Sequence, residues 1–337
     1  MNVLYRPITK DDFDALFSLS KQAGVGVTSL QFDKKKMEAW IELSIRSLAE
    51  PVVKPGAEKY LFVLEDLHTN EVVGTSGLIA CIGEDLPFYN YRISTYTRFC
   101  KELNITHFYD SLALVNDYHG ATEIGSLVLS KTHRGLKLGE FLSRARFLFM
   151  ANHPERFSNL VIAEMRGISD EQGRSPFWDS LGRHFFKMDF DEADRLSELT
   201  NKQFIADLMP RGAIYTELLS SEAQAAIGQP HPHTQPAYRI LQKEGFTYRG
   251  YIDIFDGGPV IEAQQPNIHT IRLSQVLPIV KIAEIQGGQR CMVSSTTTDF
   301  RAMMSETSVN EGGCIISPYI AEHCRLKEGD SIRVCPL

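Results

Sequence analysis

The sequence predicts an α+β fold followed by a small all-β region at the C-terminal end. Through residues 1–259, helical and strand-like patterns alternate, and one pair of strands is separated by only a short turn. The composition changes at residues 256–259, Asp-Gly-Gly-Pro, after which short strand-like runs and turns prevail. We therefore predict two domains, residues 1–259 and residues 260–337, of which the second is barrel-like. The length of 337 residues agrees with this division, at about 150 residues per domain.

The N-terminal elements follow from capping residues and hydrophobic spacing. Residues 2–8 read as a strand, and Thr9 with Asp12 three positions later predicts a helix that continues to Gln22. Asp33 is expected to cap a second helix, because the apolar residues between positions 37 and 45 share one face. A hairpin follows, since residues 59–66 and 71–80 are rich in strand-forming side chains around a turn at 68–70.

The remaining elements are predicted from the same patterns. Residues 81–120 contain many aromatic residues and two further strand-like runs, and a turn at residues 116–120 ends this region. After it, strands are predicted at residues 121–130, 159–165, 212–219 and 246–256, and helices at residues 140–151, 175–182, 221–228, 237–245 and within 191–208.

Charge and composition exclude several classes of protein. A net charge of −7 argues against a nucleic-acid scaffold or a polybasic membrane binder. The charged, amphipathic N-terminus does not resemble a secretory signal, and no stretch approaches the ~18 apolar residues of a membrane span. The cysteines form no CxxC pair and have no zinc-site spacing, so we expect no metal, free thiols and a cytoplasmic location. They are Cys81, Cys100, Cys291, Cys314, Cys324 and Cys335.

The loop at residues 131–139 is a candidate anion site, because it connects a predicted strand to the start of a predicted helix. The first N–H groups of a helix lack intrahelical partners, and the helix dipole adds positive potential there. Arg134, Gly135 and Gly139 frame this turn, and Lys137 adds a positive charge among the exposed amides. A pyrophosphate would fit such a nest of N–H groups.

The run LVLSKTHRGLKLGEFL, residues 127–142, resembles the acyl-CoA-binding motif of the GCN5-related N-acetyltransferase superfamily. It departs from the motif at Lys137, where the superfamily usually has glycine. The resemblance implies a mixed, mostly antiparallel central sheet flanked by helices, in which the strand before the loop separates from its neighbour and pairs with pantetheine. The coenzyme contacts that it implies are Leu127, Val128, Leu129, Arg134, Gly135, Leu136, Lys137, Leu138 and Gly139.

A closer resemblance covers most of residues 1–260. The segments 60–66, 161–190, 204–215, 225–237 and 244–259 are similar, in order, to the arginine N-succinyltransferase family. This resemblance implies transfer of succinyl from succinyl-CoA to the α-amino group of L-arginine, the first step of a bacterial catabolic route. Succinyl-CoA would be a co-substrate, with no permanently bound cofactor. Some members of the family are one subunit of a pair. The resemblance therefore also implies that this chain forms a homo-oligomer or a heterodimer with a paralogous subunit.

The resemblance points to His231 as the proton donor to the departing thiolate. Histidine suits this role because its ordinary pKa of ~6.5 lies near working pH. Pro230 and Pro232 flank it and restrict the backbone. A backbone N–H near Leu127 to Leu129 is the expected donor to the oxyanion.

Binding of arginine requires carboxylates for the guanidinium group and a basic or amide group for the α-carboxylate. Glu123, Glu164 and Arg166 are the chosen candidates, and Glu164 is the preferred acid because it ends a predicted buried strand. The segment 24–30 is either a closing loop or a plain connection. Further charged candidates are Asp170, Glu171, Arg174, Asp253 and Asp256.

Two alternatives stay open from the sequence. One is a regulatory subunit that senses arginine or ornithine and acyl-CoA with little turnover, which the departure at Lys137 would favour. The other is an enzyme with a covalent cysteine intermediate, which is disfavoured because no cysteine lies beside a histidine in the sequence. The choices between arginine and ornithine, and between succinyl and other acyl groups, are likewise open.

Overall fold

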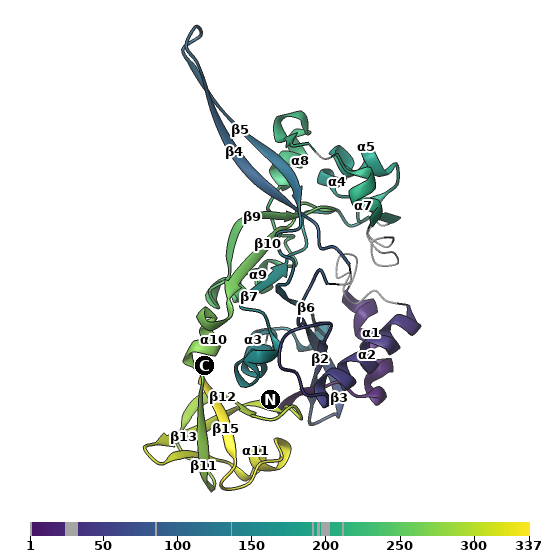
Figure 1. Cartoon of the computed structure of the whole chain (residues 1–337). Helices are drawn as coiled ribbons and strands as arrows, with labels where there is room; N and C mark the ends of the chain where they lie inside the picture. The colour runs from purple at the N-terminus through teal and green to yellow at the C-terminus, as the bar shows by residue number, and fades with distance from the viewer. Residues whose placement is uncertain are drawn as a thin grey trace.

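The computed structural model describes residues 2–23, 33–84, 86–135, 137–190, 192–193, 196, 203–210 and 212–337. Its strands join into one 15-stranded sheet in the order β12-β15-β11-β14-β13-β1-β2-β3-β6-β7-β10-β9-β4-β5-β8. Strands β1 to β10 form the central part of this sheet, and β11 to β15 form the C-terminal part, drawn in yellow and yellow-green (Figure 1). The predicted mixed sheet with flanking helices is therefore confirmed.

The N-terminal half of the central sheet is antiparallel and contains the predicted hairpin. The hairpin pairs Lys59 with Ile79 at one end and Asp66 with Glu71 at the other. The predicted start of the first helix at Thr9 is a 3-10 turn, Lys10–Asp12, which leads directly into α1. Elements of this half are β1 (Val3–Pro7), α1 (Phe13–Ala23), α2 (Lys34–Ala49), β2 (Lys59–Asp66), β3 (Glu71–Ile79) and β6 (Thr122–Leu129).

Alternation along β2 gives the sheet two apolar faces. Leu61 and Val63 point toward α1 and α2, where they share a core with Met37. Tyr60 and Phe62 point to the opposite face, which α3 (Leu138–Asn152) covers. The helix α3 is buried along most of its length, so the loop that precedes it is attached to the core.

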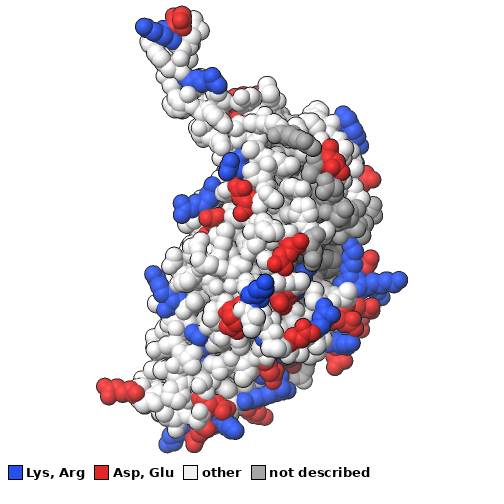
Figure 2. Space-filling view, viewed as in Figure 1, with Lys and Arg blue, Asp and Glu red and all other residues white. Residues whose placement is uncertain are grey.

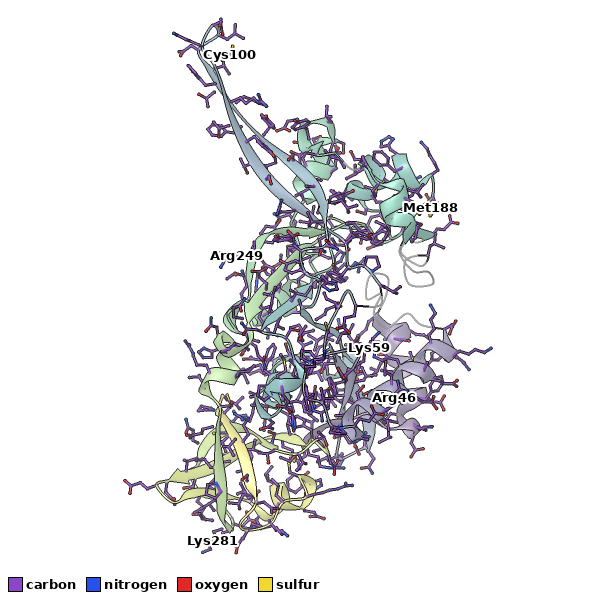
Figure 3. All side chains as sticks on the ribbon, viewed as in Figure 1. Arg46, Lys59, Cys100, Met188, Arg249 and Lys281 are labelled. Carbon is purple, nitrogen blue, oxygen red and sulfur yellow. The ribbon has the colours of Figure 1, made fainter. Side chains whose placement is uncertain are left out.

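The other half of the central sheet carries a long projecting hairpin, β4 and β5, which Figure 1 shows extending away from the body. Figure 3 places Cys100 near the end of this hairpin and Met188 among the helices beside its base. Elements of this half are β4 (Asn90–Cys100), β5 (Ile105–Val115), β7 (Leu160–Glu164), α4 (Pro176–Ser180), α5 (Gly182–Phe186), α7 (Gln203–Leu208), β8 (Ile214–Tyr215), α8 (Ser221–Ala226), α9 (Gln235–Lys243), β9 (Thr247–Asp253) and β10 (Pro259–Gln264).

Two predicted elements are shorter in the structure. The strand predicted at 212–219 is limited to Ile214 and Tyr215, because only these residues pair with β5 before a 3-10 turn begins. The helix predicted within 191–208 is described as α7 only at its C-terminal end, and the rest of that prediction lies largely outside the described residues.

The predicted boundary after residue 259 falls at the start of a strand of the central sheet. Strand β10 lies between β7 and β9, and residues 254–258 connect β9 to β10. The two glycines at the composition change therefore belong to a hairpin connection, and Pro259 is the first residue of β10. The C-terminal region of strands begins later, at Gln275, after the short helix α10 (His269–Leu273).

The predicted C-terminal region of strands is present, and its strands β11 to β15 close into a small barrel. Closure follows because β12 pairs with both β13 and β15. Two short helices, α10 and α11, lie within residues 260–337, which the sequence pattern had predicted as all-β. The barrel joins the central sheet where Tyr5 of β1 pairs with Ala302 of β13. Its elements are β11 (Gln275–Ile282), β12 (Gln289–Ser295), β13 (Ala302–Asn310), β14 (Gly313–Ile316), α11 (Pro318–His323) and β15 (Ser331–Pro336).

Acidic and basic side chains are interspersed over the face of the molecule drawn in Figure 2. Within the described residues, no helix is both long and apolar enough to cross a membrane. The same residues contain no group of three or more His, Cys, Asp or Glu side chains arranged to hold a metal ion. The six cysteines are all free thiols.

Candidate active site

The central feature of the site is a pair of parallel strands that separate. Strands β6 and β7 pair only at Thr122 with Val161 and at Glu123 with Ile162. Beyond Glu123, β6 continues along β3 on its other side, from Ile124 to Leu129. The edge of β6 that faces β7 is therefore open over its second half, among the residues that the structure describes.

A β-bulge lies where β6 leaves β7. The register of β3 and β6 shifts between Thr75 and Gly77, and Ser126 has a positive φ of 54°. Just before the bulge, the carbonyl of Gly125 accepts a hydrogen bond from the buried Arg146 side chain of α3, at 3.3 Å. Bulges bend a strand and redirect its side chains and amides. This one directs the following residues of β6 toward a cavity.

The cavity has a volume of about 1210 Å³ and joins four parts of the chain. They are the end of β6, the loop before α3, the segment that follows β7, and the segment from His231 through α9. Its size lies slightly above the range of about 300–1,000 Å³ that is usual for small-molecule sites. The cavity can therefore hold an extended ligand with its reactive end at the separated strands.

The loop of residues 131–139 presents its backbone to this cavity. Gly135 has a positive φ of 88°, and nothing lies within 4 Å of where a side chain would begin. Lys137, the departure from the superfamily pattern, has φ 59° and ψ 9° and is the N-cap of α3. It adopts the left-handed conformation that glycine would adopt there. The loop therefore keeps its turn despite the lysine.

Most of the predicted coenzyme contacts line the cavity. Leu138 does not, because its side chain is buried in the core beneath α3. Leu136 lies outside the described residues, as does the proposed closing segment 24–30. The predicted contacts that do line the cavity are Leu127, Val128, Leu129, Arg134, Gly135, Lys137 and Gly139.

His231 lies on the cavity wall and is held from two sides. Its backbone N–H donates to the carbonyl of Arg166 at 2.8 Å, and its Nδ1 accepts from the backbone N–H of His233 at 3.1 Å. Burial lowers the pKa of His231, and the nearby Arg166 and His233 lower it further, against a hydrogen bond to the Ser169 backbone. The imidazole is therefore mostly neutral at pH 7.

The structure brings Arg166, Asp170 and Glu171 to the same cavity as His231. The Arg166 side chain donates from Nη2 to Ser169 Oγ at 2.6 Å. Glu123 and Glu164 are not among the lining residues, and Glu164 accepts a hydrogen bond from Asn90 Nδ2 at 3.0 Å.

The other charged candidates have structural partners. Arg174 donates from Nε to Asp170 at 2.8 Å. Asp256 is buried and accepts from the backbone N–H groups of Gly167 and Gly258, at 2.6 and 2.8 Å. The Asp253 carboxylate accepts from the backbone N–H groups of Phe255 and Asp256, at 2.8 and 2.9 Å. These two aspartates therefore shape the turn beside the cavity.

Sequence reasoning missed two cations of α9 that also line the cavity, Arg239 and Lys243. Their spacing of four residues puts both on one face of a helix. This spacing, on a helix that follows the predicted catalytic loop directly, is the signal that could have found them.

Separated parallel strands, a bulge at the separation and a glycine-containing loop before a buried helix define an N-acyltransferase of the GCN5-related class. Residues 3–270 match the family model described as the arginine N-succinyltransferase beta subunit. Residues 275–336 match the model of the C-terminal domain of that subunit. The chain therefore belongs to the arginine N-succinyltransferase family. The first match ends within α10, and the second begins at the start of β11.

Similar proteins cover the whole chain. A Pseudomonas aeruginosa protein named arginine N-succinyltransferase subunit beta is 42% identical over 339 residues, which is 99% of this chain and 98% of the relative. A Yersinia pestis protein named arginine N-succinyltransferase is 41% identical over 340 residues, covering 98% of this chain and 97% of the relative. The solved structure of arginine/ornithine succinyltransferase subunit AI from Pseudomonas aeruginosa has a TM-score of 0.89 and 36% identity, with 99% and 98% of the two chains covered.

Proposed function

We propose that this protein transfers a succinyl group from succinyl-CoA to the α-amino group of L-arginine in arginine catabolism. The observation that carries the proposal is the full-length similarity to arginine N-succinyltransferases, at about 42% identity to one of them. The cavity supports it, because the open edge of β6, the loop before α3 and His231 all line one space.

In this proposal the coenzyme follows the open edge of β6. The N–H groups of the loop and of the first turn of α3 bind the pyrophosphate, with Arg134 and Lys137 beside them. Pantetheine then pairs with β6 in the manner of an added strand. This path brings the thioester to Leu127–Leu129, where a backbone N–H stabilises the oxyanion as the tetrahedral intermediate forms.

The amine attacks the thioester carbon directly, so a C–N bond forms and the C–S bond breaks. The lone pair of neutral His231 lies on Nδ1, which accepts from the backbone N–H of His233, so this hydrogen bond opens when Nδ1 takes the proton that the attacking amine must lose. The imidazolium then donates a proton to the departing thiolate of CoA. The lowered pKa suits this order, because the imidazole is neutral before the reaction starts. The histidine is thus still the proton donor to the thiolate, after first acting as a base.

In this proposal, two charged side chains at the reacting end of the cavity each bind a substrate group of opposite charge. Glu171 is the carboxylate on the cavity wall for the guanidinium group, since Asp170 is already paired with Arg174, and Arg166 is the cation there for a carboxylate of arginine or of succinyl. We assign no direct substrate contact to Glu123 or Glu164, since neither lines the cavity. Arginine is proposed over ornithine because a carboxylate can bind the planar guanidinium group through two parallel hydrogen bonds.

A sensing subunit without turnover would share this fold, and the test separates the two functions. The departure at Lys137 no longer favours such a subunit, because its backbone keeps the turn that glycine would make. Purified protein is mixed with succinyl-CoA, L-arginine and a reagent for free thiols. Release of CoA that depends on arginine is expected. Binding of either ligand without release of CoA would show a sensor instead.

The pH dependence tests the state of His231. Because its pKa lies below the ordinary value of 6.5, we expect kcat/KM to fall through that lowered pKa as the pH drops. The α-amino group of arginine must also be neutral to attack, so its own deprotonation adds a second limb at about pH 8 or above. The profile is measured with arginine at limiting concentration between pH 5 and pH 9, for the unaltered protein and for a His231→Asn variant. Absence of the lower limb in the unaltered protein, or its retention in the variant, would contradict the assignment.

The working form of the enzyme completes the proposal. One relative is named a subunit, and we propose that this chain also acts in an oligomer, either with a second copy or with a paralogous chain. We further propose a cytoplasmic location, where the six free thiols would stay reduced.

A further inference from the structure

The charge of the cavity differs in sign from the charge of the protein. The whole chain has a net charge of −7, yet the cavity wall carries six cationic side chains against three carboxylates. Two of those carboxylates are engaged elsewhere, Glu140 by Arg144 at 3.6 Å and Asp170 by Arg174. The cavity is therefore suited to a ligand with several negative charges. The six cations are Lys131, Arg134, Lys137, Arg166, Arg239 and Lys243.

Five of these cations stand in two separate groups on the cavity wall. Lys131, Arg134 and Lys137 come from the loop before α3, and Arg239 and Lys243 come from α9. Both α9 side chains are exposed, and within the described residues neither has a hydrogen bond or an ion pair. Two unpaired cations one helical turn apart form a ready site for an anionic group.

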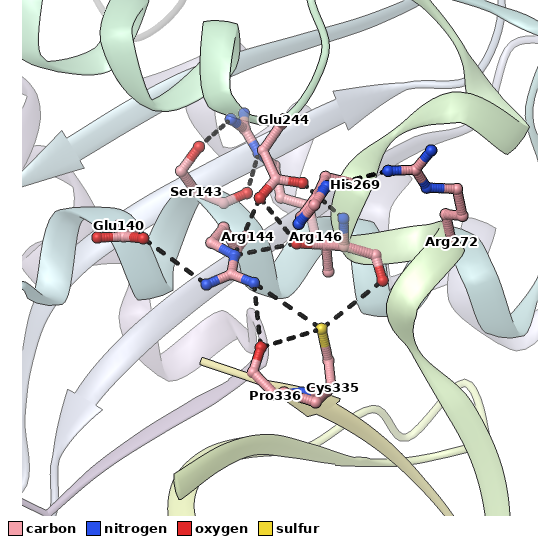
Figure 4. Close-up of polar contacts among 10 residues, drawn as sticks. Glu140, Ser143, Arg144, Arg146, Glu244, His269, Arg272, Cys335 and Pro336 are labelled. Atoms are coloured by element: carbon pink, nitrogen blue, oxygen red, sulfur yellow. Dashed lines mark hydrogen bonds and ion pairs between the residues drawn. The ribbon is translucent and has the colours of Figure 1, made fainter.

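A buried network fixes α9 beside α3, as Figure 4 shows. Glu244, the residue directly after α9, accepts from Arg144 Nε of α3 at 3.0 Å. The same carboxylate accepts from the backbone N–H and the hydroxyl of Thr270, at 2.8 and 2.9 Å. Because Glu244 points into the core, the preceding Lys243 is turned about 100° around the helix axis and reaches the cavity. The buried contacts of Glu244 thus hold α9, and with it Arg239 and Lys243, in position beside the cavity.

We propose that Arg239 and Lys243 bind the 3′-phosphate of coenzyme A. This inference rests on the proposed function, in which the donor is a CoA thioester. The coenzyme carries two phosphate sites, a diphosphate and a phosphomonoester on the ribose. The loop before α3 supplies N–H groups and three cations for the diphosphate. The α9 pair, a guanidinium and an ammonium without other partners, matches the doubly charged monoester.

The test compares CoA with 3′-dephospho-CoA, which lacks only that phosphate. Dissociation constants of both are measured by calorimetry for the unaltered protein and for the double variant Arg239→Ala, Lys243→Ala. We expect the unaltered protein to bind CoA at least about tenfold more tightly than dephospho-CoA. In the double variant this ratio should fall to about 1, mainly because CoA binds more weakly.

Two single variants serve as controls. Arg134→Ala should weaken CoA and dephospho-CoA alike, since both carry the diphosphate, and so should keep the ratio. Lys281→Ala removes an exposed cation of the barrel, on β11 and far from the cavity (Figure 3), and should change neither constant. Far-ultraviolet circular dichroism confirms that each variant is folded.

The outcomes separate this inference from the proposed function. Equal binding of the two coenzymes by the unaltered protein, or an unchanged ratio in the double variant, would overturn the 3′-phosphate site. If the ratio behaves as expected but arginine releases no CoA from succinyl-CoA, the 3′-phosphate site stands and the proposed function fails.

Discussion

Replacing His231 with asparagine should lower kcat by about 10²- to 10⁴-fold, the usual contribution of a positioned acid–base group. The dissociation constant of succinyl-CoA should change little, because the contacts proposed for the coenzyme come from β6, the loop before α3 and α9. Asparagine keeps the backbone N–H that bonds to the carbonyl of Arg166, so the wall of the cavity is retained. Steady-state kinetics and calorimetry on the same preparation measure the two quantities.

The neighbouring histidine provides the matched control. His233 contributes its backbone N–H to Nδ1 of His231, and a His233→Asn variant keeps that group. Its loss of kcat should therefore be much smaller than that of His231→Asn. Equal losses in kcat and in coenzyme affinity for His231→Asn would remove this residue from proton transfer. A larger loss of kcat for His233→Asn would instead assign the proton transfer to the imidazole of His233.

Replacing Glu244 with alanine should destabilise the protein by about 3–5 kcal/mol, because it leaves a buried charge without its partner. Glu244 and Arg144 are both buried, and their ion pair joins the end of α9 to α3 (Figure 4). Without the carboxylate, Arg144 would keep the hydroxyl of Thr270 at 3.0 Å and more distant contacts with Glu140 at 3.6 Å, the carbonyl of Pro336 at 3.5 Å and the thiol of Cys335 at 3.8 Å, with no close ion pair. The free energy of unfolding in urea measures the loss.

A conservative variant separates charge from shape at this position. Glu244→Gln keeps an oxygen that can accept from Thr270 and retains the volume, so its loss of stability should be smaller than that of the alanine variant. A loss below about 1 kcal/mol in Glu244→Ala would contradict the description of this pair as a buried link. Such a result would also mean that α9 is held by its apolar contacts alone.

Elements defined by near neighbours were predictable. The second helix starts after Asp33, whose side chain accepts from the backbone N–H of Lys36, and its buried face has the predicted spacing. The hairpin of β2 and β3 has the predicted bounds to within one residue. Capping, turn chemistry and hydrophobic period all act within a few residues, so the sequence displays them directly.

Elements shaped by specific packing contacts were less predictable. The single helix predicted at residues 175–182 is divided into α4 and α5 at Leu181. Trp178 lies against Gly182 so closely that a side chain there would begin 2.2 Å from the indole ring. Similarly, β10 follows a change of composition yet completes the central sheet between β7 and β9. The first outcome depends on a steric contact between residues four apart that the hydrophobic pattern does not display, and the second depends on strands remote in sequence.

By itself, the sequence determined the loop before α3, the residue types at the reacting end and the family to which the chain belongs. Each of these properties is encoded in short segments of sequence. It can therefore be recognised without knowing which other parts of the chain those segments contact. Only the tertiary structure decided that His231 contacts Arg166, that Glu164 instead holds Asn90, and that α9 adds cations to the cavity wall. Such pairings depend on how strands separate and helices pack across the sheet, because the side chains involved are brought together only when the whole core forms.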